Sequence, residues 1–141
     1  MRQDKGFCTA AMTRWVSALL ATLLVGCTPP TVKVDLQAVA QGKQIYHTLA
    51  CDSCHGLDAV GSTRTYAPTH NHLRATAEQR IHAANYTGKA KNAAEYIRES
   101  IVEPKAYVVT GYEHVRFGMP SFAHLSEREV NALVQFLYQQ E

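Results

Sequence analysis

The pentapeptide Cys51-Asp52-Ser53-Cys54-His55 constrains this chain more than any other feature of its sequence. Two cysteines separated by two residues and followed at once by histidine form the pattern used for covalent attachment of haem c. The spacing lets both thiols reach the two vinyl groups of one haem, while the adjacent imidazole points at the iron. The motif therefore predicts one haem c, bound through Cys51 and Cys54, with His55 as an axial iron ligand.

Other uses of such a motif fit the sequence less well. A redox-active Cys51–Cys54 disulfide needs a βαβ context, and no strand pattern precedes Cys51. A zinc site needs two further ligands, and His70 and His72 lie closer together than zinc-binding histidines usually do. A chance match is the third alternative. An export signal at the N-terminus favours haem, because bacterial haem c attachment takes place outside the cytoplasm.

Residues 1–26 have the pattern of a bacterial secretory signal. Basic residues precede an apolar stretch over 15–25, which is shorter than the ~20 residues that span a bilayer. Met12 is an alternative start of the chain, which would leave Cys8 outside the protein. The segment is therefore predicted to direct export and then to be removed.

The apolar stretch ends in Leu-Val-Gly-Cys, which resembles the lipoprotein box of bacteria. In that box Cys27 becomes the first residue of the mature protein and carries several acyl chains, which together give a firm membrane anchor. An ordinary signal cut elsewhere, which leaves a free Cys27, is the alternative. The resemblance predicts a signal peptide over 1–26, a lipidated cysteine and tether over 27–34, and a folded domain over 35–141. It implies a place at the outer face of the bacterial cytoplasmic membrane.

Composition and charge narrow the range of partners. The 141 residues suffice for one domain, and 46% hydrophobic with 18% charged residues is typical of a globular protein. Of the 14 basic and 12 acidic residues, Arg2, Lys5, Arg14 and Asp4 lie in the signal, which leaves 11 of each in the remainder. A nucleic-acid-binding protein needs a basic face, so no nucleic-acid partner is predicted.

Two helices, one at each end of the domain, are predicted to pack together. Asp35 is a suitable N-cap, and the apolar residues after it recur at helical spacing. Gly42 costs that helix ~1 kcal/mol, which favours a close approach of another helix at this point. Ser126 and Glu129 form a capping box, and the apolar residues that follow it at helical spacing are Val130, Leu133, Val134 and Leu137.

The middle of the chain is predicted to be less regular. A helix over 93–102 ends before Pro104, and a short helix over 76–84 interrupts the loop-rich segment 57–91. No convincing alternating strand pattern is found, and the apolar run over 107–109 is interpreted as extended loop. The chain is therefore predicted to be all-α.

Met119 is the predicted second axial ligand of the iron. The other two methionines lie in the signal, and a glycine and a proline shape the turn around Met119. Its alternative role is to fill a gap in the core. His70 and His72 are the competing ligands, because they flank the loop expected to pass the haem. Ligation by His55 and Met119 would raise the reduction potential and close both axial positions.

These features together resemble class I cytochromes c over about residues 35–140. The matching positions are Gly42, Tyr46, the 51–55 motif, Met119 and Pro120. The resemblance implies an all-α fold in which the N- and C-terminal helices cross beside one covalently bound haem. It also implies that Pro68 accepts a hydrogen bond from the proximal histidine, and that the protein transfers single electrons.

Residues 94–112 narrow the resemblance to the cytochrome domains of respiratory and photosynthetic chains. Similar segments occur in the domain fused to subunit II of haem-copper oxidases and in the monohaem lipoprotein subunit of alternative complex III, which oxidises quinols. The sequence shows neither a copper-site domain nor a transmembrane hairpin, which favours the second group. The implied partners are a redox donor and a redox acceptor in a membrane-bound complex.

Outer-sphere electron transfer is the predicted function, with the chain acting as a carrier or as a non-catalytic subunit of an oxidoreductase complex. The alternative is a haem protein with an open distal site that acts as a gas sensor or a small redox enzyme. The alternative requires that Met119 does not bind the iron, so CO binding to the reduced protein separates the two hypotheses.

Overall fold

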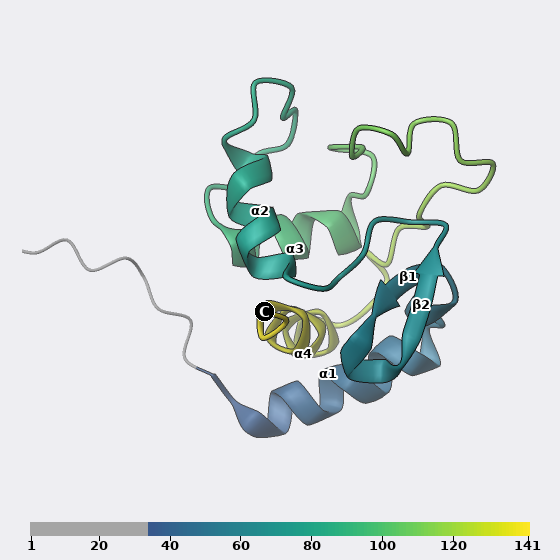
Figure 1. The fold of residues 1–141 in the computed structure, drawn as a ribbon. Helices are drawn as coiled ribbons and strands as arrows, with labels where there is room; N and C mark the ends of the chain where they lie inside the picture. Colours follow the sequence, from purple (N-terminus) through teal and green to yellow (C-terminus); the bar gives the residue numbers. More distant parts are fainter. Residues whose placement is uncertain (1–33) are drawn as a thin grey trace, which may run out of the picture. The chain divides into compact units, whose positions relative to one another are not determined.

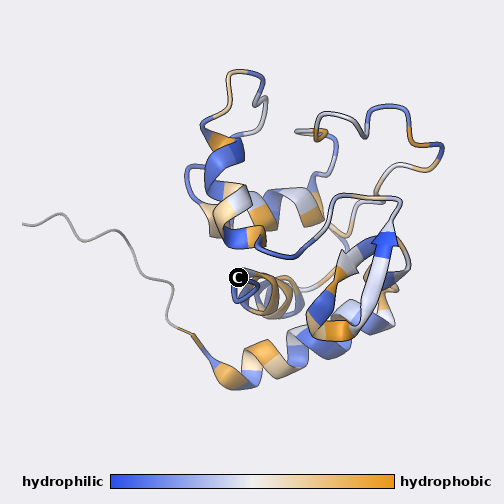
Figure 2. Cartoon of the chain, in the orientation of Figure 1, coloured by the Kyte–Doolittle hydropathy of each residue, from blue (hydrophilic) through white to orange (hydrophobic). Residues whose placement is uncertain are grey.

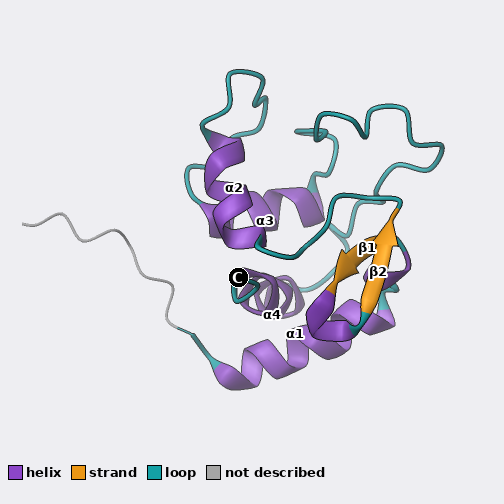
Figure 3. Cartoon of the chain, viewed as in Figure 1, coloured by secondary structure: helices purple, strands orange, loops and turns teal. Residues whose placement is uncertain are grey.

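The structure, a computed structural model, describes residues 34–141 (Figures 1 and 3). Its elements in chain order are α1 (Leu36–Thr48), β1 (His55–Leu57), β2 (Ser62–Thr65), α2 (Leu73–Ile81), α3 (Ala93–Val102) and α4 (Glu127–Tyr138). Two 3₁₀ turns, η1 (Cys51–Ser53) and η2 (Asp58–Val60), precede β1 and β2 respectively. The predicted signal over 1–26, Cys27 and nearly all of the tether lie outside the described residues.

Side chains cap both terminal helices where the sequence predicts. The Asp35 carboxylate accepts hydrogen bonds from the backbone N–H of Gln37 at 2.9 Å and of Ala38 at 3.3 Å. At α4, the side chains of Ser126 and Glu129 each accept from the other's backbone N–H. Because these bonds satisfy N–H groups that have no partner within the helix, they fix where each helix begins. Both predicted N-caps are confirmed.

Helices α1 and α4 cross in close contact at Gly42 (Figure 1). A Cβ atom at this position would lie 2.6 Å from the carbonyl carbon of Ala132 and 2.8 Å from Cβ of Phe136. Separations this short are not tolerated in proteins, and the backbone of Ala132 cannot move aside as a side chain could. The predicted close approach at Gly42 is therefore confirmed.

Helix α4 carries both apolar and polar residues (Figure 2), and its second half is buried on more than one face rather than along one stripe. Contacts reach it from α1, α2 and α3, so the buried positions include 130 and the whole segment 132–137. The sequence pattern predicted only four of these positions. The largest fully buried side chains of the core are Tyr46, Leu57, Ile97, Leu133 and Val130.

The prediction of an all-α chain is wrong at one place, because the largely helical fold contains a small sheet. Strands β1 and β2 pair antiparallel, with His55 opposite Thr65, Leu57 opposite Ser62 and an irregular register between them. The Ser62 hydroxyl lies 2.8 Å and 2.9 Å from the carbonyl oxygens of Asp52 and His55. The strands have three and four residues, which is too short for an alternating pattern of apolar and polar residues to be seen in the sequence. The hydrogen bonds of the Ser62 hydroxyl help to hold the two strands together.

The other elements match the sequence to different degrees. Helix α3 covers the predicted residues 93–102 and ends before Pro104, and 107–109 form a loop. Helix α2 begins three residues earlier than predicted, after His72, which has a left-handed φ of 55°. Within the described part of the chain, no helix is long and apolar enough to cross a bilayer.

Tyr86 ties the loop between α2 and α3 to the body of the domain. Its hydroxyl donates a 2.5 Å hydrogen bond to the Glu99 carboxylate, which also accepts the backbone N–H of Lys89 at 2.7 Å. Burial raises the pKa of Tyr86 to about 12, and the hydrogen bond to Glu99 acts in the same direction.

This shift predicts a loss of stability at alkaline pH. The folded-state pKa lies above the unfolded value of 10.0, so the contribution of Tyr86 is complete below pH 10 and is lost as the pH rises through about 12. Urea unfolding at pH 9 and pH 11 should show a smaller decrease in stability for Tyr86→Phe than for the wild type. Equal decreases in the two proteins would contradict the assignment.

Candidate functional site

The attachment motif turns sharply between α1 and β1. Ala50 adopts the left-handed conformation, with φ at 54°, and the turn η1 closes through a 3.3 Å hydrogen bond from the Cys54 N–H to the Cys51 carbonyl. Both cysteines are half-buried free thiols. Burial raises the pKa of Cys51 to about 11, and the neighbouring Asp52 raises it further.

His55 follows the turn at the start of β1 and is 8% exposed. Its Nδ1 donates a 2.6 Å hydrogen bond to the carbonyl oxygen of Pro68. Because this bond places the ring proton on Nδ1, the lone pair of Nε2 is available for a metal ion. The structure thus brings Pro68 and His55 together in the arrangement that the resemblance implies, and their roles towards iron stay predictions.

Hydrogen bonds clamp the segment 67–70 onto the motif. The Ala67 N–H donates to the Cys54 carbonyl at 3.1 Å, and the His70 N–H donates to the Gly56 carbonyl at 2.8 Å. The Thr69 hydroxyl donates to the same Gly56 carbonyl at 3.0 Å. These hydrogen bonds on either side of Pro68 fix the position of its carbonyl oxygen. The carbonyl in turn fixes the position of Nδ1 of His55.

Both imidazoles near the motif are held in the neutral form. Burial lowers the pKa of His55; the hydrogen bond to Pro68 opposes this effect, and the charge of Arg80 adds to it. Burial lowers the pKa of His70 well below its usual value, with His55 and Arg80 acting in the same direction. Neutral imidazole is the form that binds a metal ion, so the site is prepared for ligation at neutral pH.

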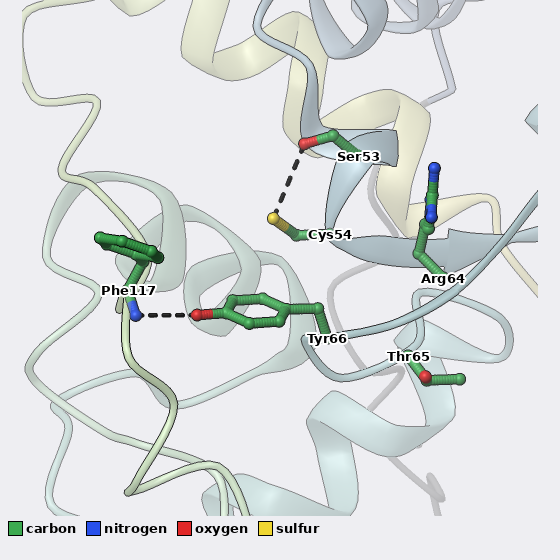
Figure 4. A pocket seen from close by; sticks show the side chains of 6 residues that line it. All are labelled: Ser53, Cys54, Arg64, Thr65, Tyr66 and Phe117. Atoms are coloured by element: carbon green, nitrogen blue, oxygen red, sulfur yellow. Dashed lines mark hydrogen bonds between the residues drawn. The ribbon is translucent and has the colours of Figure 1, made fainter.

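A cavity of about 510 Å³ opens beside the motif, between β2 and the loop before α4 (Figure 4). Its lining residues are Ser53, Cys54, Arg64, Thr65, Tyr66 and Phe117. The Tyr66 hydroxyl accepts a 2.8 Å hydrogen bond from the Phe117 N–H, which joins the two walls. The volume lies within the range of cofactor sites, roughly 300–1,000 Å³. Of the residues predicted to hold the haem, Cys54 lines this space, whereas Cys51 and His55 do not.

Met119 lies two residues beyond Phe117 and is half-buried in the loop before α4. The structure brings Phe117 to the lining of the cavity but not Met119 itself. Its role as an iron ligand stays a prediction.

The two competing histidines lie in different surroundings. The ring of His70 stacks on that of His55, with centroids 3.9 Å apart and planes inclined by 16°. Two axial ligands of one iron point at each other across it, whereas these rings lie face to face, so His70 is not arranged to oppose His55. His72 is exposed at the start of α2. Among residues 34–141, no group of three or more histidine, cysteine or acidic side chains is placed to hold a zinc ion.

Sequence reasoning missed two features of the site. Tyr66 and Phe117 form a hydrogen-bonded pair although 51 residues separate them. The Tyr46 hydroxyl lies 3.0 Å from Nδ1 of His70 across 24 residues. Residue types alone gave no signal of either pairing, since both arise where distant segments meet.

The fold and the motif together define a c-type cytochrome. The chain belongs to the family described as cytochrome c oxidase, cbb3-type, subunit III, whose family model matches residues 37–137. It is therefore a haem c-binding electron-transfer protein, and its partners are redox proteins of a respiratory chain. A search of curated proteins found no match.

Proposed function

We propose that this chain is a monohaem cytochrome that passes single electrons, with one haem attached covalently through Cys51 and Cys54. His55 is the proximal ligand and Met119 the distal ligand. The observation that carries this proposal is the buried His55 ring, with its Nδ1 bonded to Pro68 and its Nε2 free to bind a metal ion.

The side chains and backbone around His55 hold the proposed haem ligand in a form that can bind iron. Bound haem supplies a reversible one-electron couple at its iron. The Pro68 carbonyl holds His55 in the tautomer that can ligate, and the clamp between 67–70 and 54–56 keeps that carbonyl in place. Phe117 is 69% exposed and Tyr66 40% exposed, so the cavity that they line is open to a redox partner.

The reduced absorbance spectrum, before and after addition of CO, tests the proposal on the haem-loaded protein. A low-spin c-type spectrum that CO leaves unchanged is expected, because both axial positions are filled. Met119→Ala should bind CO and lose the low-spin spectrum. Rapid CO binding by the wild type would overturn ligation by Met119 and favour the alternative, a gas sensor or small redox enzyme with an open distal site.

The proposal extends to a lipid anchor at Cys27, at the outer face of the bacterial cytoplasmic membrane. The sequence beyond the signal is close to neutral, so long-range electrostatic steering is weak. A tether can replace steering by raising the effective concentration of the protein near its partner. The resemblance of 94–112 supports a place as a subunit of a quinol-oxidising complex such as alternative complex III.

Cys27→Ser tests the anchor. The variant should be released into the soluble fraction while the wild type stays with membranes, and the mass of the wild-type N-terminus should include acyl chains. A wild type that is soluble and carries no lipid would contradict the anchor and leave the electron-transfer function standing.

A further inference from the structure

A second imidazole stands behind the proximal ligand. The ring of His70 lies 3.9 Å from that of His55 and is nearly parallel to it. His70 also contacts Tyr46: its Nδ1 is 3.0 Å from the hydroxyl of Tyr46, which is fully buried on α1. The site therefore contains a continuous row of Tyr46, His70 and His55, of which the proposed function uses only the last.

The backbone of His70 and the ring of Tyr46 are each held in place. The His70 backbone is bonded to Gly56, the residue next to His55, at 2.8 Å. The Tyr46 ring packs against Phe136 of α4 at 5.5 Å between centroids, close to the crossing of α1 and α4 at Gly42. The His70 ring is thus held against His55 by the backbone on one side and by the helix crossing on the other.

The contact between Tyr46 and His70 joins segments that lie 24 residues apart in the chain. Tyr46 is fully buried, so water does not compete for its hydroxyl, which is hydrogen-bonded to Nδ1 of His70 at 3.0 Å.

We propose that Tyr46 and His70 are positioning residues that fix the orientation of the His55 imidazole plane, and through it the electronic state of the bound iron. The inference rests on the proposed role of His55 as a ligand. The hydrogen bond to Pro68 holds His55 at one atom, about which the ring could still tilt. A flat ring stacked at 3.9 Å opposes that tilt, because His70 would have to move with it and stretch its bond to Tyr46.

The test compares haem-loaded wild type with Tyr46→Phe and His70→Phe. Tyr46→Phe keeps the ring against Phe136 and removes only the hydroxyl. His70→Phe keeps a flat ring but removes the nitrogen that Tyr46 contacts. The readouts are the proton NMR shifts of the haem methyl groups in the oxidised protein, which report the orientation of the axial ligand plane, and the reduction potential.

Each single variant should change the pattern of methyl shifts and the reduction potential. The double variant should change the shifts and the potential no more than a single variant does, because both substitutions break the same contact. Tyr86→Phe is the matched control, because it also removes a hydrogen-bonded tyrosine hydroxyl and contacts neither histidine of the row. It should leave the methyl pattern unchanged.

Folded variants with wild-type methyl shifts and potential would overturn the inference and leave the row a packing feature. If His70→Phe does not fold, Tyr46→Phe alone decides. A wild-type protein without a low-spin spectrum would overturn the proposed function itself, and this result would be known before any variant is compared.

Discussion

His55→Ala is expected to eliminate the low-spin spectrum of the reduced protein. The substitution removes the imidazole whose Nε2 is free to bind iron, while Nδ1 is engaged by Pro68. His70 cannot take its place without breaking its bonds to Tyr46 and Gly56. Removing a partner in the outer shell of a metal site costs roughly 10–100-fold in affinity or activity, and losing the ligand itself should cost more.

The expected spectrum of His55→Ala is high-spin, with CO binding to the reduced form. The variant should also be less stable, because the half-buried Pro68 carbonyl loses its donor, at a cost of at most about 1–3 kcal/mol. His82→Ala is the control, since His82 is exposed at the end of α2 and its loss should change neither spectrum nor stability. A low-spin spectrum in His55→Ala would assign the proximal position to another residue.

Gly42→Ala is expected to destabilise the domain strongly, because the added methyl group meets the backbone of the crossing helix. The new Cβ would meet the Ala132 backbone and Cβ of Phe136 at 2.8 Å, so α1 and α4 would have to separate. Overpacking costs about 1–3 kcal/mol where side chains can adjust, and more where they cannot. Because the clash here is with backbone atoms, we expect a cost of about 4 kcal/mol. Alanine recovers ~1 kcal/mol of helix propensity, which leaves a net loss of about 3 kcal/mol.

Thermal unfolding of the haem-loaded protein measures this loss, which should lower Tm by about 10–20 °C. Gln44→Ala is the matched control, because it places alanine at an exposed position of the same helix and should change Tm by at most a few degrees. A Gly42→Ala variant that melts like the wild type would mean that the two helices do not meet at this point.

The helix boundaries could be predicted because local interactions set them. Asp35 and Ser126 cap their helices with bonds to residues two or three positions away. Helix α3 ends just before Pro104, which cannot continue a helix. The β1–β2 hairpin could not be predicted, because its strands are too short for a pattern and depend on Ser62. Helix α2 begins three residues before its predicted start, because the left-handed His72 carries no signature in the sequence.

The same distinction applies to the site. Cys51, Cys54 and His55 are adjacent in the chain, so their common chemistry was visible in the sequence. The contact between Pro68 and His55 spans 13 residues and was expected only from the resemblance. The sequence indicates His70 as a competing iron ligand or a zinc ligand, but not as a neighbour of His55. Its stacking on His55 depends on how the 67–70 segment folds back onto the motif.

Helix α1 is also a rigid spacer. The chain enters the folded domain at Asp35, and the attachment motif begins just beyond the other end of the helix. Thirteen residues at 1.5 Å each make α1 about 20 Å long. A membrane anchor before Asp35 would therefore be joined to the haem-binding motif through this helix. The distance between Asp35 and Cys51 is set by helix geometry and does not depend on the length of a flexible tether.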